Sequence, residues 1–158
     1  MAPPLSLKAR AMQSLALREH SRVELRRKLL RAARQRDADT AQASDPAAEV
    51  DTLLDWLAAQ RHLSEARFVE SRVHARAQRF GNRRIAQELA QHGAALDDAT
   101  AARLQASEFS RAEAIWRRKF GAVPAADVAA RAKQMRFLAG RGFSADVIRK
   151  VVRGDSED

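Results

Sequence analysis

Three stretches of the sequence repeat one pattern, and this repeat constrains the fold more than any other feature. They read HSRVELRRKLL (20–30), FGNRRIAQELA (80–90) and FSADVIRKVVR (143–153). When Ser21, Gly81 and Ser144 are aligned, an aliphatic residue recurs four and eight positions later in each copy. These aliphatic residues are Leu25 and Leu29, Ile85 and Leu89, and Ile148 and Val152. The spacing is helical, so it predicts three copies of one helical unit.

The remaining composition also favours helices. Tyr is absent, Gly and Pro are few, and Ala, Arg, Leu, Glu and Gln dominate, which are residues that lose little freedom in a helix. The sequence therefore predicts an all-α protein of three tandem three-helix repeats, about nine helices, in an elongated, solenoid-like molecule. We expect the first repeat at 1–60 with a long loop at 34–44, the second at 61–108 and the third at 109–153. An acidic tail at 154–158 is expected to be disordered.

Two capping boxes mark helix starts. Ser21 with Glu24 opens a helix that is expected to end near Ala33, and Ser110 with Glu113 predicts a second start. The two tryptophans, Trp56 and Trp116, stand at positions typical of a core, so they are interpreted as packing residues and not as platforms for nucleic-acid bases.

Charge is distributed unevenly along the chain, whose formal net charge is +9. Residues 1–36 carry ten Lys or Arg and two acidic residues, a net of +8, whereas residues 37–60 carry six acidic residues and no Lys or Arg, a net of −6. Asp51 and Asp55 share one helix face, which is typical of a solvated surface. A basic chain rich in Arg commonly binds nucleic acid or an acidic protein surface. The alternative is that the charge is incidental and the chain is a structural adaptor.

The sequence offers little for catalysis. It has no Cys, no phosphate-binding glycine loop and no nucleophile elbow, and its four His lack the spacing that puts two metal ligands on one helix face. We therefore expect no enzyme activity, no cofactor and no metal. The N-terminus has no apolar run suited to a signal peptide or membrane span, so we expect a cytoplasmic protein.

Cations recur in the repeated helix and just before it, which suggests one cationic side along the molecule. The expected contacts to a partner or to DNA are Arg18, Arg22, Arg26, Arg27, Arg83, Arg84, Arg136, Arg141, Arg149 and Lys150. A helix, a turn and a capped second helix also describe a DNA-reading helix-turn-helix, so a stand-alone DNA-binding regulator is the alternative. The stretch RVELRRKLL (22–30) offers mostly Arg, Glu and Leu, which are not the usual readers of base edges. Contacts to DNA phosphates without specificity for the base sequence are therefore favoured.

Three blocks of this chain resemble a known family. REHSRVELRRKL, ARFVESRVHARAQRFGNRRIAQELAQHG and KQMRFLAGRGFSADVIRKVV are similar, in order, to the three motif blocks of the bacterial regulatory proteins of the RecX family. The chain departs from the family pattern in LSEARF, where the family often has paired acidic residues, and in its long 34–44 segment.

The resemblance implies a modulator of the RecA recombinase that is not an enzyme. Such proteins bind the RecA filament on single-stranded DNA, usually in its groove, and suppress its ATPase, strand-exchange and co-protease activities, which damps the SOS response. An elongated repeat with a cationic side could contact several subunits at once. We expect a monomer that contacts single-stranded DNA through the filament, or directly and without sequence specificity.

Overall fold

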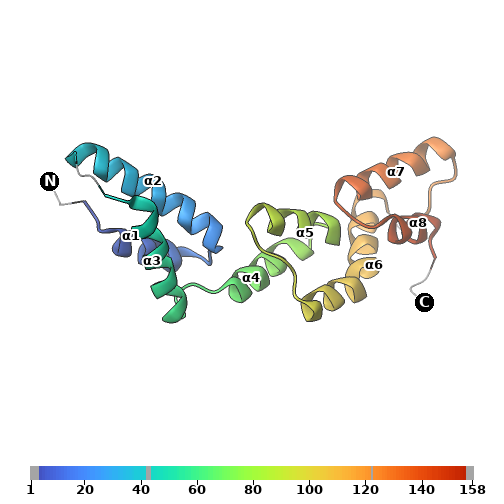
Figure 1. Ribbon diagram of the computed structural model, residues 1–158. Helices are drawn as coiled ribbons and strands as arrows, with labels where there is room; N and C mark the ends of the chain where they lie inside the picture. The colour runs from blue at the N-terminus through green and yellow to red at the C-terminus, as the bar shows by residue number, and fades with distance from the viewer. Residues whose placement is uncertain (1–3, 42–43, 122, 156–158) are drawn as a thin grey trace. The chain divides into compact units, whose positions relative to one another are not determined.

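The computed structural model describes residues 4–41, 44–121 and 123–155, and within these residues the chain forms eight α-helices and no strand (Figure 1). The helices are α1 (Leu7–Leu17), α2 (Arg22–Thr40), α3 (Pro46–Ala59), α4 (Glu65–Ala77), α5 (Asn82–Gln91), α6 (Asp98–Phe120), α7 (Val128–Gly140) and α8 (Ala145–Arg153). The predicted all-α repeat fold is confirmed. Most of the tail predicted to be disordered, residues 156–158, lies outside the described residues.

The repeat detected in the sequence is visible in the structure. Each of the three stretches forms a helix that follows another helix after a short turn, which gives the pairs α1–α2, α4–α5 and α7–α8. The aliphatic residues at the fourth and eighth aligned positions are all buried, which explains why these positions repeat. They are Leu25 and Leu29, Ile85 and Leu89, and Ile148 and Val152.

The chain divides into two compact units. The first comprises Met1–Ser71 with His92–Ala94, and in it α1, α2 and α3 pack together (Figure 1). Apolar residues spaced along one side of α2 meet those of α3 and α1, because a helix buries the residues that return to one face every three or four positions. This core consists of Leu7, Ala11, Leu25, Leu29, Ala33, Val50, Leu54, Leu57 and Leu63.

The second unit comprises Arg72–Gln91 and Ala95–Asp158, and its main core lies between α6, α7 and α8. Trp116 fills the centre, with a side chain that is 2% exposed, and its Nε1 donates to Gln134 Oε1 at 2.8 Å. The prediction of Trp116 as a packing residue is therefore confirmed. This core consists of Phe109, Ala112, Ile115, Trp116, Leu138, Phe143, Ile148, Val151 and Val152.

Two glycines let the turn before α5 lie directly against the turn before α8. Gly81 N donates to Arg141 O at 2.8 Å, and Arg83 N donates to Gly142 O at 3.1 Å. A Cβ on Gly81 would lie 2.3 Å from Phe143 N, which no backbone tolerates. Gly142 has φ +86°, a conformation that favours glycine. The two turns are thus joined backbone to backbone.

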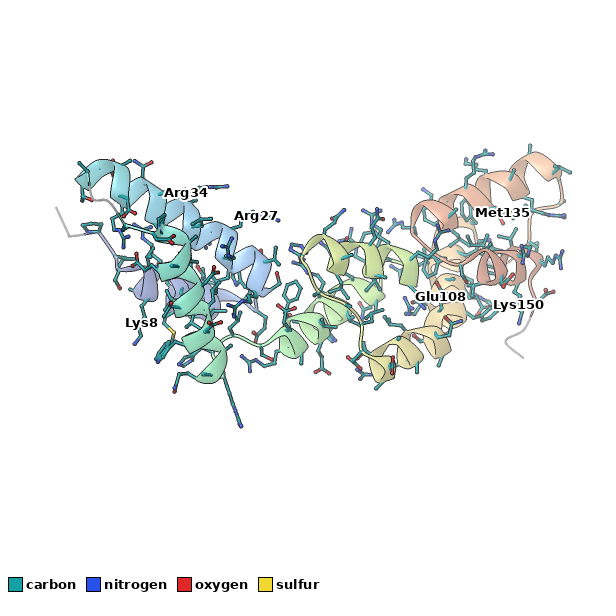
Figure 2. The ribbon with its side chains drawn as sticks, viewed as in Figure 1. Lys8, Arg27, Arg34, Glu108, Met135 and Lys150 are labelled. Atoms are coloured by element: carbon teal, nitrogen blue, oxygen red, sulfur yellow. The ribbon has the colours of Figure 1, made fainter. Side chains whose placement is uncertain are left out.

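A buried carboxylate of α6 forms hydrogen bonds to the residues that follow the same two turns. Glu108 of α6, labelled in Figure 2, is 1% exposed, and its Oε1 accepts hydrogen bonds from Asn82 N and Ser144 N, both at 3.2 Å. These N–H groups belong to the first residue of α5 and to the N-cap of α8. A helix start leaves its first N–H groups without partners in the helix, so one side chain satisfies two helices.

Nearby, the Arg111 guanidinium donates to the carbonyls of Ala77, Phe80 and Leu104, and it also bonds the side chain of Asn82. Burial lowers the pKa of Arg111. Its contacts hold the turn between α4 and α5 on α6, so we assign Arg111 to the structure of the fold.

One predicted break is absent and another is shorter than expected; the absent break, at Ser110, corrects the expected nine helices to the eight that the described residues form. The predicted loop at 34–44 is helical as far as Thr40, because Arg36 bonds Glu49 of α3 and Gln35 bonds Asp39 one turn on. The predicted start at Ser110 lies inside α6, where the Ser110 hydroxyl donates back to Ser107 O at 3.1 Å. Without Gly or Pro nearby, nothing interrupts that helix.

Trp56 was predicted to pack in the core, and this is wrong. Its side chain is 37% exposed on α3, and the Lys8 ammonium lies 3.9 Å from a centroid of its ring system. Because the neighbouring positions Leu54 and Leu57 already face the core, Trp56 lies at the edge of that face. The flat ring is covered on one side by a cation instead of by apolar residues.

Candidate cationic interface

Three of the predicted binding arginines form ion pairs within the first unit. Arg18 bonds both oxygens of Glu24. Arg22 Nη2 donates to Asp55 Oδ1 at 2.6 Å. The guanidinium of Arg26 makes two bonds to the carboxylate of Asp51, at 2.7 and 3.1 Å. These arginines join α1 to α2 and α2 to α3.

The same contacts give the acidic block a structural role. Asp51 and Asp55 were predicted to form a solvated face, and their side chains are 43% and 73% exposed, but each also pairs with an arginine of α2. Hydrogen bonding from Arg26 lowers the pKa of Asp51, and hydrogen bonding from Arg18 lowers the pKa of Glu24. The excess positive charge of residues 1–36 is therefore partly neutralised by the acidic segment that follows it in the chain.

A different set of α2 arginines remains available to a partner. Arg27, Arg31 and Arg34 are exposed, and among the described residues no carboxylate forms an ion pair with them. They lie along the side of α2 opposite its buried residues, and Figure 2 labels Arg27 and Arg34 on that helix. Together with Leu30 and Gln35 they line an open hollow of about 430 Å³. We call these three residues the α2 ridge.

Only Arg27 of this ridge was predicted. Arg34 was missed because the helix was expected to end near Ala33, whereas Arg31 lay inside the expected helix and was not selected. Their signal was nonetheless present in the sequence: they stand four and seven residues after Arg27, which places all three on one face of a continuous helix.

In the second unit, two predicted residues flank one aromatic ring. The Arg84 guanidinium lies 4.2 Å from the Phe80 ring centroid, and that of Arg141 lies 5.6 Å from it. Arg84 also donates to Gly140 O at 3.4 Å, and Arg141 donates to Arg79 O at 3.2 Å. Both side chains therefore support the joined turns, and the Arg84 side chain, which is 45% exposed, also forms an ion pair with Glu88 at 3.8 Å.

The other predicted cations of the second unit lie separately. Arg149 is paired with Asp146 one turn earlier on α8. Arg83, Arg136 and Lys150 are exposed, and no ion pair to them exists in the part of the chain that the structure describes. The sequence thus predicted a single class of cations, whereas the structure separates cations that form an ion pair from cations that form none within the described residues.

The described residues contain no group of three or more His, Asp or Glu side chains placed to hold a metal ion. No helix in residues 4–41, 44–121 or 123–155 combines the length and apolar character that crossing a bilayer requires.

Comparison with protein families identifies two domains along the chain. Residues 64–102 match the model of the second three-helix domain of RecX, and residues 106–152 match that of the third. The first match ends inside α6 and the second begins inside it. One continuous helix therefore contributes to both domains, which explains why the predicted break within it does not exist.

Relatives with known names cover nearly the whole chain. "Regulatory protein RecX" of Ralstonia nicotianae is 51% identical over 96% of this chain and 89% of its own length, and that of Leptothrix cholodnii is 50% identical over 96% and 90%. The crystal structure of RecX from Lactobacillus salivarius shares the fold with a TM-score of 0.64 at 15% identity, covering 93% of this chain and 92% of that one. The chain belongs to the RecX family of regulatory proteins.

Proposed function

We propose that this chain is a negative modulator of the RecA recombinase. It binds the RecA filament on single-stranded DNA, in the filament groove, and inhibits ATP hydrolysis, strand exchange and co-protease activity, so that it regulates DNA repair and the SOS response. It acts in the cytoplasm as a monomer, by binding and not by catalysis, and without a cofactor. The observation that carries the proposal is the 51% identity to a RecX regulatory protein over 96% of the chain.

The α2 ridge supports a binding mechanism. Arg27, Arg31 and Arg34 present guanidinium groups that have no acidic partner among the described residues of their own chain. Such groups bind carboxylates or phosphates through paired hydrogen bonds. We assign the ridge to contact with an acidic surface of the filament protein, and we assign Arg22 and Arg26 to the structure of the first unit.

The exposed cations of the second unit extend this proposal. Arg83, Arg136 and Lys150 stand in or beside the helices that repeat the α2 pattern. We propose that the repeats at 1–60, 61–108 and 109–153 each offer cations to the filament, so that several weak contacts add to one stable attachment.

Co-sedimentation with preformed filaments tests this function. Filaments of RecA on single-stranded DNA are pelleted with the purified chain, and we expect the chain in the pellet at moderate salt. The stand-alone regulator makes the opposite prediction, since it would shift a duplex of defined sequence and stay in the supernatant of the filaments. That pair of results would refute filament binding as the function.

A further inference from the structure

A second cationic surface lies entirely within the second unit. It is a hollow of about 350 Å³, which is within the size range of small-ligand pockets. Its charged residues are Arg79, Arg118, Lys119 and Arg141, and none of its described lining residues is acidic. The remaining lining residues are Gln78, Ile115 and Phe137. Of the four cations, only Arg141 was predicted from the sequence.

Three helix ends place these cations together. Arg79 follows the end of α4, Arg118 and Lys119 belong to the last turn of α6, and Arg141 follows the end of α7. Cations are common at helix C-termini because the carbonyl groups there carry partial negative charge. Cations are thus expected where three helix C-termini come together, even without a ligand. The question is whether the four cationic side chains exceed the partial negative charge of the three C-termini.

The balance favours a surplus of positive charge. Three helix C-termini supply roughly −0.5 each, or about −1.5 in total, against four cationic side chains, which leaves about +2.5. Arg117 of the same α6 turn pairs with Glu113, whereas Arg118 and Lys119 have no ion-pair partner in the described chain. Arg118 and Lys119 are therefore not neutralised by a carboxylate of the described chain, and a bound anion would neutralise them.

The wall of the hollow is suited to a planar group beside that anion. Ile115 and Phe137 provide apolar surface, and the Arg141 guanidinium lies 5.2 Å from the Phe137 ring centroid. Aromatic rings and guanidinium planes both stack on nucleic-acid bases. Cations next to such a surface match a nucleotide, which carries a phosphate and a flat base, better than a carboxylate side chain, which carries only the charge.

We infer that this hollow binds the backbone of single-stranded DNA, with phosphate on the four cations and an unpaired base against Phe137 and Arg141. A duplex fits less well because its bases are stacked inside and cannot reach the wall. The inference rests on the proposed function, since it names where this chain holds the DNA of the filament. It nevertheless concerns binding that does not require RecA.

Fluorescence anisotropy of labelled oligothymidine with the full-length chain, without RecA and over a range of salt, tests the inference. The variant Arg118→Gln/Lys119→Gln removes two cations of the hollow. Each lost phosphate contact lowers the slope of log K against log salt by about 0.7, so we expect a decrease of about 1.4. If affinities converge at about 1 M salt, this is roughly a 25-fold loss at about 0.1 M.

The matched control is Arg131→Gln/Lys133→Gln, which removes one Arg and one Lys from exposed positions of α7 outside the hollow. It should keep the wild-type slope and affinity. Phe137→Leu keeps an apolar side chain but removes the ring, and it should weaken binding about fivefold or more with an unchanged slope. Circular dichroism must show wild-type helicity for every variant.

Two results with these variants would overturn the inference. One is an equal loss in the hollow variant and the control, which would mean general attraction by net charge. The other is wild-type oligothymidine binding by the hollow variant together with lost inhibition of RecA, which would make the occupant an acidic protein surface. Inhibition of RecA by the wild-type chain, measured in parallel, distinguishes a failure of this inference from a failure of the proposed function. If the wild-type chain inhibits RecA but does not bind oligothymidine, the inference fails and the proposed function stands.

Discussion

Arg26 and Arg27 are neighbours in the sequence, yet their surroundings give them different tasks. Arg26 faces α3 and bonds Asp51 twice, whereas Arg27 points away from the core and has no ion pair among the described residues. One residue of rotation along a helix is about 100°, so adjacent side chains lie on different faces. The role of a cation on α2 is therefore set by its position relative to α3.

Charge reversal distinguishes the two tasks. Arg26→Glu places a carboxylate next to Asp51, so we expect a lower melting temperature in thermal circular dichroism. Arg27→Glu changes the net charge by the same amount without facing a carboxylate, so its melting temperature should stay near the wild-type value. Equal melting temperatures for the two variants would show that the Arg26 ion pair does not stabilise the first unit.

The contact between Arg18 and Glu24 should make stability depend on pH. Hydrogen bonding from Arg18 lowers the pKa of Glu24 in the folded chain. Ionised Glu24 therefore adds stability above its unfolded pKa of about 4.3, and this stability is lost as the pH falls through the lower folded value. We expect Arg18→Gln to melt below the wild type at neutral pH and to converge with it in acid. A constant difference across this range would contradict the assignment.

At the scale of elements, two turns and one buried carboxylate organise the second unit. The backbone contact of Gly81 with Arg141 and the two bonds accepted by Glu108 connect α5, α6 and α8. At these positions a buried polar group has hydrogen-bond partners. Such arrangements specify one geometry because any other leaves an N–H without a partner.

Removing the carboxylate should therefore be costly. Glu108→Ala leaves the N–H groups of Asn82 and Ser144 unbonded, and we expect it to cost about 3 kcal/mol of unfolding free energy. That loss corresponds to roughly 6–12 °C in Tm for a chain of this size. Glu108→Gln keeps an oxygen acceptor and should lose less. If both variants melt like the wild type, Glu108 does not hold the turns.

The elements show what could be predicted from the sequence and what could not. The repeat was predictable because Leu25, Ile85 and Ile148 occupy equivalent buried positions. Buried positions on a helix require apolar residues at regular spacing, and this spacing is visible in the sequence. The end of α2 was not predictable in the same way, because Arg36 is held by Glu49 of another helix. A local capping pattern at Ser110 was also misleading, since nothing in the sequence ends the helix before it.

The binding residues also divide into those that the local sequence indicates and those that depend on contacts between helices. The cationic character of α2 was evident from composition, but the pairing of Arg22 and Arg26 depends on α3, which a linear pattern does not place. The hollow of the second unit was missed almost entirely, because Arg79, Arg118 and Arg141 come from three separate helix ends. Only folding brings them together.

The α2 ridge gives the element-scale test of partner binding. Arg27→Glu/Arg31→Glu reverses two ridge cations, and we expect it to release the chain from RecA filaments in co-sedimentation. Arg131→Glu/Lys133→Glu makes the same change of net charge on α7 and should still pellet. Release of both variants would show that overall charge, and not the ridge, retains the chain on the filament.

At the scale of the whole molecule, family membership and surface chemistry lead to one account. The chain is a RecX family protein over nearly its full length, and its described residues offer exposed cations but no cluster of metal-binding side chains. In our account, the α2 ridge contacts the filament protein and the hollow of the second unit holds single-stranded DNA. Each surface lies within one compact unit.

The most direct test of the central claim is ATP hydrolysis by RecA on single-stranded DNA, with this chain titrated at substoichiometric ratios. We expect inhibition well below one chain per RecA, because a modulator bound along a filament affects several subunits. We also expect the α2 ridge variant to inhibit far less than its matched control. Unchanged hydrolysis at an equimolar ratio, with the chain folded and filaments preformed, would contradict the proposed function.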